Sequence, residues 1–213
     1  MAFSETFDFA GPAGRLEAVL MVPHRAPVAA AVVCHAHPLH GGIMHYKLVF
    51  RAAKALQAQG AAVLRFNFRG VGRSEGQHDH GRGERADARA ALDEMERRFP
   101  GLPQVLGGFS FGSLVALRVG AADPRVRALL ALGLPLRLDP AEFLAGCTKP
   151  RLFVQGEHDE FGSGQAVREL VARLPPPRSL VVAPGADHFF TGRLEAVQQA
   201  IEAWAALRPW ETP

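Results

Sequence analysis

Short apolar segments alternate with longer amphipathic segments along most of the 213-residue chain. The apolar segments are bounded by glycine, proline and polar residues, and they have the length of strands that are buried on both faces. We predict strands over these ranges: 16–22, 29–34, 61–66, 103–108, 129–133, 151–155 and 180–183. The first of them is expected to be antiparallel to its neighbours.

The segments between the strands carry apolar residues at helical spacing. In the segment 45–59, for example, the apolar residues fall on one helical face, and Gly60 follows as a natural stop. We predict helices over these ranges: 45–59, 83–99, 111–122, 165–174 and 193–207.

Strands that alternate with helices pair in parallel through crossover connections, which place helices on both faces of one sheet. The sequence therefore predicts a single α/β domain over residues 1–213, with a mostly parallel central sheet. In open sheets of this kind, binding and catalytic sites lie beyond the carboxyl ends of the strands. Residues that directly follow a predicted strand are therefore the candidates for chemistry.

Composition and charge narrow the range of partners. Hydrophobic residues make up 48% of the chain and charged residues 21%, which is ordinary for a globular protein. The formal net charge is +3, but the arginines are interleaved with acids, as in residues 84–89, whereas a nucleic-acid surface would cluster them. No apolar run reaches the roughly 18 residues that a membrane span requires. We therefore expect neither a nucleic acid nor a membrane as a partner.

Two features indicate the cellular compartment. Residues 1–8 lack the basic and apolar regions of a signal peptide. The two cysteines, Cys34 and Cys147, have no spacing typical of a disulfide framework. Both features favour a reducing compartment, and we expect the protein to be cytoplasmic.

The most informative motif is Gly-Phe-Ser-Phe-Gly at residues 108–112, which matches the Gly-x-Ser-x-Gly pattern of a nucleophile elbow. The serine of such an elbow sits on a sharp strand-to-helix turn, and the flanking glycines let the backbone fold that tightly. A predicted strand ends directly before Ser110, and a predicted helix begins directly after it. We therefore expect Ser110 to be a nucleophile, with the helix N-terminus favouring the anion that forms during attack.

The same pattern occurs a second time, as Gly-Arg-Ser-Glu-Gly at residues 72–76. Here Ser74 lies well beyond the preceding predicted strand, and a polar stretch that reaches His80 comes after it. Because the motif requires a strand–turn–helix context, we interpret Ser74 as a loop serine.

A serine hydroxyl is a weak nucleophile and needs a neighbouring base. In this architecture the expected order along the chain is serine, then an acid, then histidine. Only His158 and His188 of the nine histidines come after Ser110. His188 comes after the last predicted strand, through the turn-forming residues 184–187, and we expect it to be the general base.

The acid that would orient His188 is expected in residues 156–160, Gly-Glu-His-Asp-Glu, directly after a predicted strand. We favour Asp159, which would hold the imidazole tautomer and stabilise the imidazolium. Asp187 is adjacent to His188 in sequence and cannot easily reach its ring. The remaining alternatives come after the same predicted strand or the preceding one: Glu157, Glu160 and Asp139.

Two backbone N–H groups should face the developing oxyanion. One belongs to the residue after the nucleophile, Phe111, and the other to the loop after an early central strand, here residues 34–42. Pro38 has no N–H group to offer. We favour the amide of His37, with that of Leu39 as the second choice.

The same loop supports an alternative of a different class. His35, His37 and His40 could form a metal cluster, with His78-Asp79-His80 adding ligands, as in a metal-dependent hydrolase. The spacing resembles the His-x-His-x-Asp-His run of metallo-β-lactamase-like enzymes, but Leu39 stands where the aspartate should be. Alternate residues on a strand end also point to opposite faces. The third interpretation is a non-catalytic binding protein, and our preferred one needs neither a metal nor a cofactor.

Four stretches together resemble the α/β-hydrolases, specifically the small lidless bacterial serine esterases related to dienelactone hydrolase. They are Cys-His-Ala-His-Pro-Leu-His-Gly-Gly (34–42), Arg-Phe-Asn-Phe-Arg-Gly-Val-Gly-Arg-Ser-Glu-Gly (65–76), Gly-Gly-Phe-Ser-Phe-Gly (107–112) and Pro-Gly-Ala-Asp-His-Phe-Phe (184–190). The resemblance implies a triad of Ser110, Asp159 and His188, and it explains the second motif as a common loop without catalysis. Dienelactone hydrolase itself uses a cysteine nucleophile, so its substrate is not expected here.

With this triad, we expect a serine hydrolase that cleaves small ester or thioester substrates through an acyl-enzyme. Larger members of the fold insert a cap where this chain has only residues 134–150, with one short helix predicted near 140–145. We therefore expect no large cap and an open site. Four aromatic residues either line that site or belong to the core: Phe109, Phe111, Phe189 and Phe190.

Overall fold

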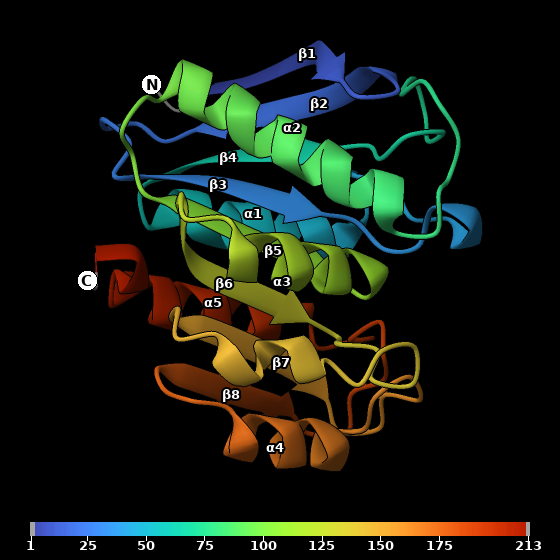
Figure 1. Ribbon diagram of the computed structural model, residues 1–213. Coiled ribbons are helices and arrows are strands. Elements are labelled where there is room, and N and C mark those ends of the chain that lie inside the picture. Colours follow the sequence, from blue (N-terminus) through green and yellow to red (C-terminus); the bar gives the residue numbers. More distant parts are fainter. Residues whose placement is uncertain (1–2, 212–213) are drawn as a thin grey trace.

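The computed structural model describes residues 3–211, which contain one eight-stranded sheet (Figure 1). The strand order is β1-β2-β4-β3-β5-β6-β7-β8. β1 and β2 are antiparallel to their neighbours, and all other pairs are parallel, which confirms the predicted mostly parallel sheet. The strands are β1 (Phe3–Gly11), β2 (Gly14–Val22), β3 (Ala29–Cys34), β4 (Ala61–Phe66), β5 (Gln104–Phe109), β6 (Val126–Leu132), β7 (Arg151–Gly156) and β8 (Arg178–Ala183).

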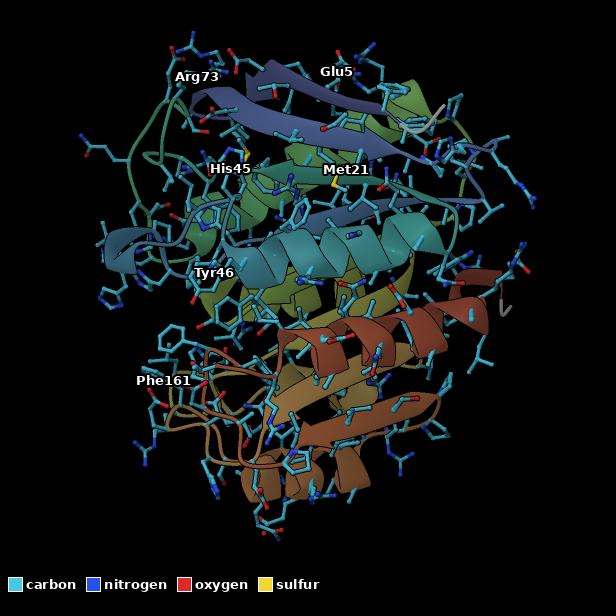
Figure 2. All side chains as sticks on the ribbon, turned by 180° about the vertical axis from the view of Figure 1, so that it is seen from behind. Glu5, Met21, His45, Tyr46, Arg73 and Phe161 are labelled. Atoms are coloured by element: carbon cyan, nitrogen blue, oxygen red, sulfur yellow. The ribbon has the colours of Figure 1, made fainter. Side chains whose placement is uncertain are left out.

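Helices cover both faces of the sheet. α2, α3 and α4 lie on the face toward the viewer in Figure 1, and α1 and α5 lie together on the opposite face, which Figure 2 shows from behind. The helices are α1 (Lys47–Ala58), α2 (Arg82–Arg98), α3 (Phe111–Ala122), α4 (Gly164–Arg173) and α5 (Leu194–Ala206), with short 3₁₀ helices η1 (Pro38–His40), η2 (Glu142–Gly146) and η3 (Pro209–Glu211). None of the helices within residues 3–211 has the length and apolarity that crossing a bilayer would take.

The central strand β3 shows how the sequence builds two cores. All six of its residues are buried, and they alternate between the two faces of the sheet. Its even-numbered residues join the apolar cluster beneath α2, α3 and α4, and its odd-numbered residues join the cluster beneath α1 and α5. Each face of the strand therefore packs against its own apolar layer, and the two layers together hold its carboxyl end in place.

The N-terminal strand β1 is absent from the predicted strands. It pairs with β2 along its whole length through a two-residue turn at Pro12 and Ala13. Phe7 and Phe9 alternate with polar residues, but only Phe9 is buried, because β1 is an edge strand with one partner. The weak apolar content of an edge strand explains why its pattern does not predict it.

The connection from β6 to β7 carries no cap. Within the described residues, 133–150 contain only the five-residue helix η2, close to the short helix predicted near 140–145. The carboxyl ends of the parallel strands are therefore left uncovered by any inserted domain, as the length of this segment predicts.

Candidate active site

Ser110 occupies a strained turn between β5 and α3. Its dihedral angles, φ 55° and ψ −124°, lie in a region that residues other than glycine rarely adopt. Its amide donates to the Leu132 carbonyl at 2.9 Å, and its own carbonyl accepts from the Ser113 amide at 2.8 Å and from Ser113 Oγ at 2.6 Å. These bonds on both sides of the residue hold the backbone in the strained conformation.

The two glycines of the motif allow the backbone segments to approach closely. A Cβ atom on Gly108 would lie 2.3 Å from the Gly112 carbonyl oxygen, and a Cβ atom on Gly112 would lie 2.3 Å from the carbonyl oxygen of His35. Contacts this short do not occur between real atoms, so a side chain at either position would move α3 away from the ends of β3 and β5.

The structure brings Ser110, His188 and Asp159 together. His188 Nε2 lies 2.9 Å from Ser110 Oγ, and His188 Nδ1 lies 2.7 Å from Asp159 Oδ2. Asp159 is 2% exposed and His188 is 3% exposed. In the tautomer that carries its proton on Nδ1, the ring donates to the carboxylate, and its Nε2 lone pair is free to accept from the serine hydroxyl.

The carboxylate of Asp159 is held from several sides. Its Oδ1 accepts hydrogen bonds from the Phe161 amide at 2.8 Å and the Gly162 amide at 3.2 Å. Its Oδ2, the oxygen that contacts His188, also accepts from Gln155 Nε2 at 2.8 Å. The carboxylate therefore has one well-defined orientation toward the imidazole.

Gln155, at the end of β7, is a member of this network that sequence reasoning did not single out. Its side chain is buried, and its Oε1 accepts from the Leu134 amide at 2.7 Å. Its Nε2 also donates to the Gly162 carbonyl at 2.6 Å. A polar residue directly after the apolar run at 152–154 was the available signal, because a buried amide must find such partners.

The alternative acids beside Asp159 face elsewhere. Glu157 accepts a hydrogen bond from the Gly185 amide at 2.8 Å and so fixes the turn that precedes His188. Glu160 is exposed at the surface.

The two more distant acids are also engaged. Asp139 forms an ion pair with Arg118, whose Nε donates at 2.9 Å. Asp187 accepts from the backbone amide of Thr191 at 2.9 Å and from its hydroxyl at 2.7 Å.

The two residues whose amides are expected at the oxyanion site, His37 and Phe111, have side chains in contact. Phe111 is the first residue of α3, where an amide has no acceptor within its helix. The rings of Phe111 and His37 have centroids 5.0 Å apart. Leu39, the second choice in this loop, already donates its amide to His37 Nδ1 at 3.2 Å.

The histidines of the loop do not form the metal cluster of the alternative interpretation. His35 is buried, and both of its ring nitrogens have backbone partners: the Ala36 carbonyl at 2.7 Å and the Phe68 amide at 3.0 Å. Burial lowers the pKa of His35 to about 4, so the ring is neutral near pH 7. Across residues 3–211, no three His, Cys, Asp or Glu side chains are arranged to hold a metal ion.

The other histidines pack as rings. His37 stacks on His40 with centroids 4.5 Å apart and contacts His78 at 4.8 Å, and His78 contacts His80 at 5.0 Å. Burial and the neighbouring imidazoles of His78 and His40 lower the pKa of His37. This group contacts Phe111 and is therefore close to the candidate nucleophile, Ser110.

Aromatic rings also surround the general-base candidate. Phe109 and Phe190 are core residues, whereas Phe189 is 47% exposed. Phe161 and Phe189 contact the ring of His188 at 4.6 and 5.3 Å between centroids. Figure 2 places Phe161 at the same edge of the sheet as Tyr46, whose ring stacks on Phe109 at 5.6 Å.

A family model described as an alpha/beta hydrolase domain matches residues 29–207. The chain belongs to the alpha/beta hydrolase family. Ser110, His188 and Asp159 thus lie in an α/β-hydrolase, the family that the four sequence stretches resemble.

The similarity of this α/β-hydrolase to its relatives covers nearly the whole chain. The chain is 38% identical over 202 residues to the uncharacterized protein RP471 of Rickettsia prowazekii, which covers 91% of this chain and 85% of that protein. It is similar to the structure of an alpha-beta serine hydrolase homologue from Coxiella burnetii, with a TM-score of 0.88, 37% identity and coverage of 93% and 96% of the two chains. It is also similar to XC6422 from Xanthomonas campestris, a serine hydrolase without a lid, with a TM-score of 0.87, 35% identity and coverage of 99% and 97%.

Proposed function

We propose that this α/β-hydrolase is a serine esterase that cleaves small ester or thioester substrates through an acyl-enzyme. The observation that carries the proposal is the continuous chain of contacts from Ser110 Oγ through His188 to Asp159, at 2.9 and 2.7 Å. Contacts of this length, in this order, are what nucleophilic catalysis by serine requires.

In the first half of the reaction, Ser110 attacks the acyl carbonyl while His188 Nε2 takes the hydroxyl proton. Asp159 keeps the imidazole in the tautomer that can accept this proton and then stabilises the imidazolium. His188 returns the proton to the departing alcohol or thiol, and the acyl group remains on Ser110. In the second half, water attacks the acyl carbonyl with His188 again as the base, the bond to Ser110 Oγ breaks, and His188 returns the proton to that oxygen as the carboxylic acid leaves.

The negative charge on the carbonyl oxygen needs donors that are in place before the reaction. We assign this role to the amides of His37 and Phe111. The N-terminus of α3 adds the partial positive charge of its helix dipole at the same point. Removal of one such donor typically lowers kcat by about 10²–10³-fold.

The absence of a cap over residues 133–150 supports a preference for small acyl groups, because no inserted segment encloses a long chain. The free and buried thiols of Cys34 and Cys147 support our placement of the enzyme in the reducing cytoplasm. The metal-dependent alternative has less support, because both ring nitrogens of His35 are hydrogen-bonded to backbone groups.

The test combines turnover with covalent labelling. The purified protein is expected to hydrolyse p-nitrophenyl acetate and a short acyl thioester, and a fluorophosphonate probe should modify the peptide that contains Ser110. Pre-incubation with the probe should remove the activity in proportion to labelling. An unlabelled Ser110 together with activity that a chelator abolishes would establish the metal-dependent alternative instead.

A further inference from the structure

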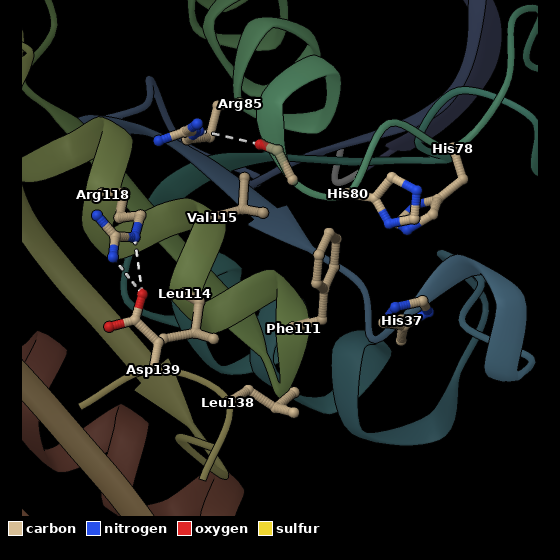
Figure 3. Close-up of a pocket in the computed structure, with 11 residues that line it drawn as sticks. His37, His78, His80, Arg85, Phe111, Leu114, Val115, Arg118, Leu138 and Asp139 are labelled. Atoms are coloured by element: carbon tan, nitrogen blue, oxygen red, sulfur yellow. Dashed lines mark hydrogen bonds and ion pairs between the residues drawn. The ribbon is translucent and has the colours of Figure 1, made fainter. Parts of the chain in front are cut away.

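A cavity of about 530 Å³ opens beside the candidate nucleophile, between α2 and α3, and we call it the α2–α3 cavity. Phe111 and His37, the two residues assigned to the oxyanion, belong to its wall. Figure 3 shows His37, His78 and His80 on one side of the Phe111 ring, and Arg85 and Arg118 on the other. The cavity therefore leads from the reacting carbonyl toward two guanidinium groups.

The far end of the cavity has an excess of positive charge. Arg85 is half-buried, and its Nε donates to the Gly81 carbonyl at 3.0 Å. Within residues 3–211 the terminal nitrogens of Arg85 form no hydrogen bond or ion pair, so they remain available for a planar, two-point contact. Arg118 is also half-buried, and it is paired with Asp139, which is the acid in the cavity wall.

Carboxylates near the cavity do not neutralise Arg85. Glu84 is fully buried, and its two oxygens accept the backbone amides of Asp79 and Gly81 at 2.9 and 2.8 Å. Asp87 is buried, and its two oxygens accept from Nε and one terminal nitrogen of Arg69 at 3.0 and 2.7 Å. A guanidinium with no acidic partner in a concave site is the side chain that best recognises a carboxylate.

The middle of the cavity is apolar. Leu114 and Val115, on the first turns of α3, lie between the Phe111 end and Arg118. At 1.5 Å per residue, Phe111 and Arg118 are separated by about 10 Å along the helix axis. This geometry suits a short alkyl chain with a charged end and not a bare anion.

The direction of proton transfer decides which part of the substrate enters. His188 must hand its proton to the departing alcohol, so the alcohol lies on the His188 side, near Phe161 and Phe189. The wall of the α2–α3 cavity includes Phe111 and His37, and among residues 3–211 it includes none of His188, Phe161 and Phe189. We propose that it binds the acyl part of substrates that carry a carboxylate at the far end of the acyl chain, with Arg85 as the main contact. This inference rests on the proposed esterase function.

A matched pair of substrates tests the inference. One is the p-nitrophenyl monoester of adipic acid, with a free carboxylate, and the other is the same ester with that carboxylate methylated. The wild-type enzyme should favour the charged substrate at least tenfold in kcat/KM, with a preference that declines as salt is added. Arg85→Gln should lower this ratio at least tenfold, and Arg85→Glu should lower it further. Arg89→Gln, an exposed change on the same helix, should leave the ratio unaltered.

Equal kcat/KM for the two esters in the wild type, or an unchanged ratio in a folded Arg85→Gln variant, would overturn the inference. Failure of the wild type to hydrolyse either ester would instead remove the proposed esterase function. In that event, calorimetric binding of adipate tests the cavity alone. Binding that Arg85→Gln weakens at least tenfold and Arg89→Gln does not supports the cavity, and no binding at millimolar adipate refutes it.

Discussion

The segments 72–76 and 108–112 share the Gly-x-Ser-x-Gly pattern, but their serines have different surroundings. Ser74 is 7% exposed, its hydroxyl donates to the Asn67 carbonyl at 2.7 Å, and it accepts from the Glu17 amide at 3.0 Å. Both hydrogen-bonding functions of that hydroxyl are therefore used to fasten a loop onto β2. The hydroxyl of Ser110 instead lies 2.9 Å from the imidazole of His188, and the backbone of Ser110 is strained.

The difference lies in the segment that comes after each serine. Residues 77–81 continue as loop and turn after the first motif, whereas α3 begins at Phe111 directly after Ser110. A helix that starts at once fixes the sharp turn and supplies a positive dipole end at the hydroxyl. The five-residue pattern thus permits an elbow, and the elements on either side decide whether it forms one.

Ser110→Ala should produce the largest separation between the two segments. We expect kcat for p-nitrophenyl acetate to fall on the order of 10⁴–10⁶-fold, because no other group supplies the nucleophile. The free energy of unfolding should change by about 0.5 kcal/mol or less. Steady-state kinetics with a urea titration measure both quantities. Retention of more than a tenth of the activity would mean that Ser110 is not the nucleophile.

Asp159→Asn should have the next largest effect. An amide in this position can donate to His188 Nδ1 and so favours the tautomer that cannot accept the serine proton, with a loss of about 10⁴-fold in kcat. The neighbouring change Glu160→Gln, at an exposed side chain, is the control and should keep full activity. A large loss in the control and a small one in Asp159→Asn would exchange the two assignments.

Gln155→Ala addresses a residue that acts through Asp159. Loosening of the carboxylate should lower kcat about 10–100-fold while KM stays within twofold, since small displacements of a positioned group carry penalties of this size. The Leu134 amide also loses its partner, which costs about 1–3 kcal/mol of stability. The measurement is kcat and KM below the unfolding transition. A variant that is less stable but has the wild-type kcat would leave Gln155 with a structural role alone.

Ser74→Ala should have the smallest effect on turnover, which we expect within twofold of the wild type. The loss of one hydroxyl leaves the Glu17 amide and the Asn67 carbonyl without that partner, so stability should fall by about 1–3 kcal/mol. Urea unfolding measures the change, with the exposed Ser4→Ala as the matched control. A loss of turnover larger than that of Ser110→Ala would reverse the comparison on which these variants are based.

The parts of this fold with buried apolar periodicity are the ones the sequence predicts well. The range predicted for α3, 111–122, agrees with the observed helix to the residue, and the all-apolar run at 29–34 is β3. Both elements bury most of their side chains, so their patterns are strong. The sequence does not predict β1, because pairing at a sheet edge depends on backbone hydrogen bonds that leave a weaker mark on the side chains.

The sequence likewise predicts only part of the candidate site. Chain order and strand ends were sufficient to select Ser110 and His188, and the structure places their side chains 2.9 Å apart. The choice among three acids in residues 156–160 depends on turn geometry, which no periodicity encodes. The role of Gln155 and the shape of the α2–α3 cavity depend on contacts between segments that are distant in the sequence, and these exist only once the helices have packed.

The contact at Gly112 has a consequence for how this protein can lose its function. The smallest addition to that residue, one methyl group, is already a wedge between α3 and the strand that leads to His37. Such a wedge would leave every reacting side chain chemically intact and still separate the two peptide groups to which we assign the oxyanion. A related protein that keeps Ser110, His188 and Asp159 can therefore still be inactive, because the mechanism we propose also requires that position 112 carry no side chain.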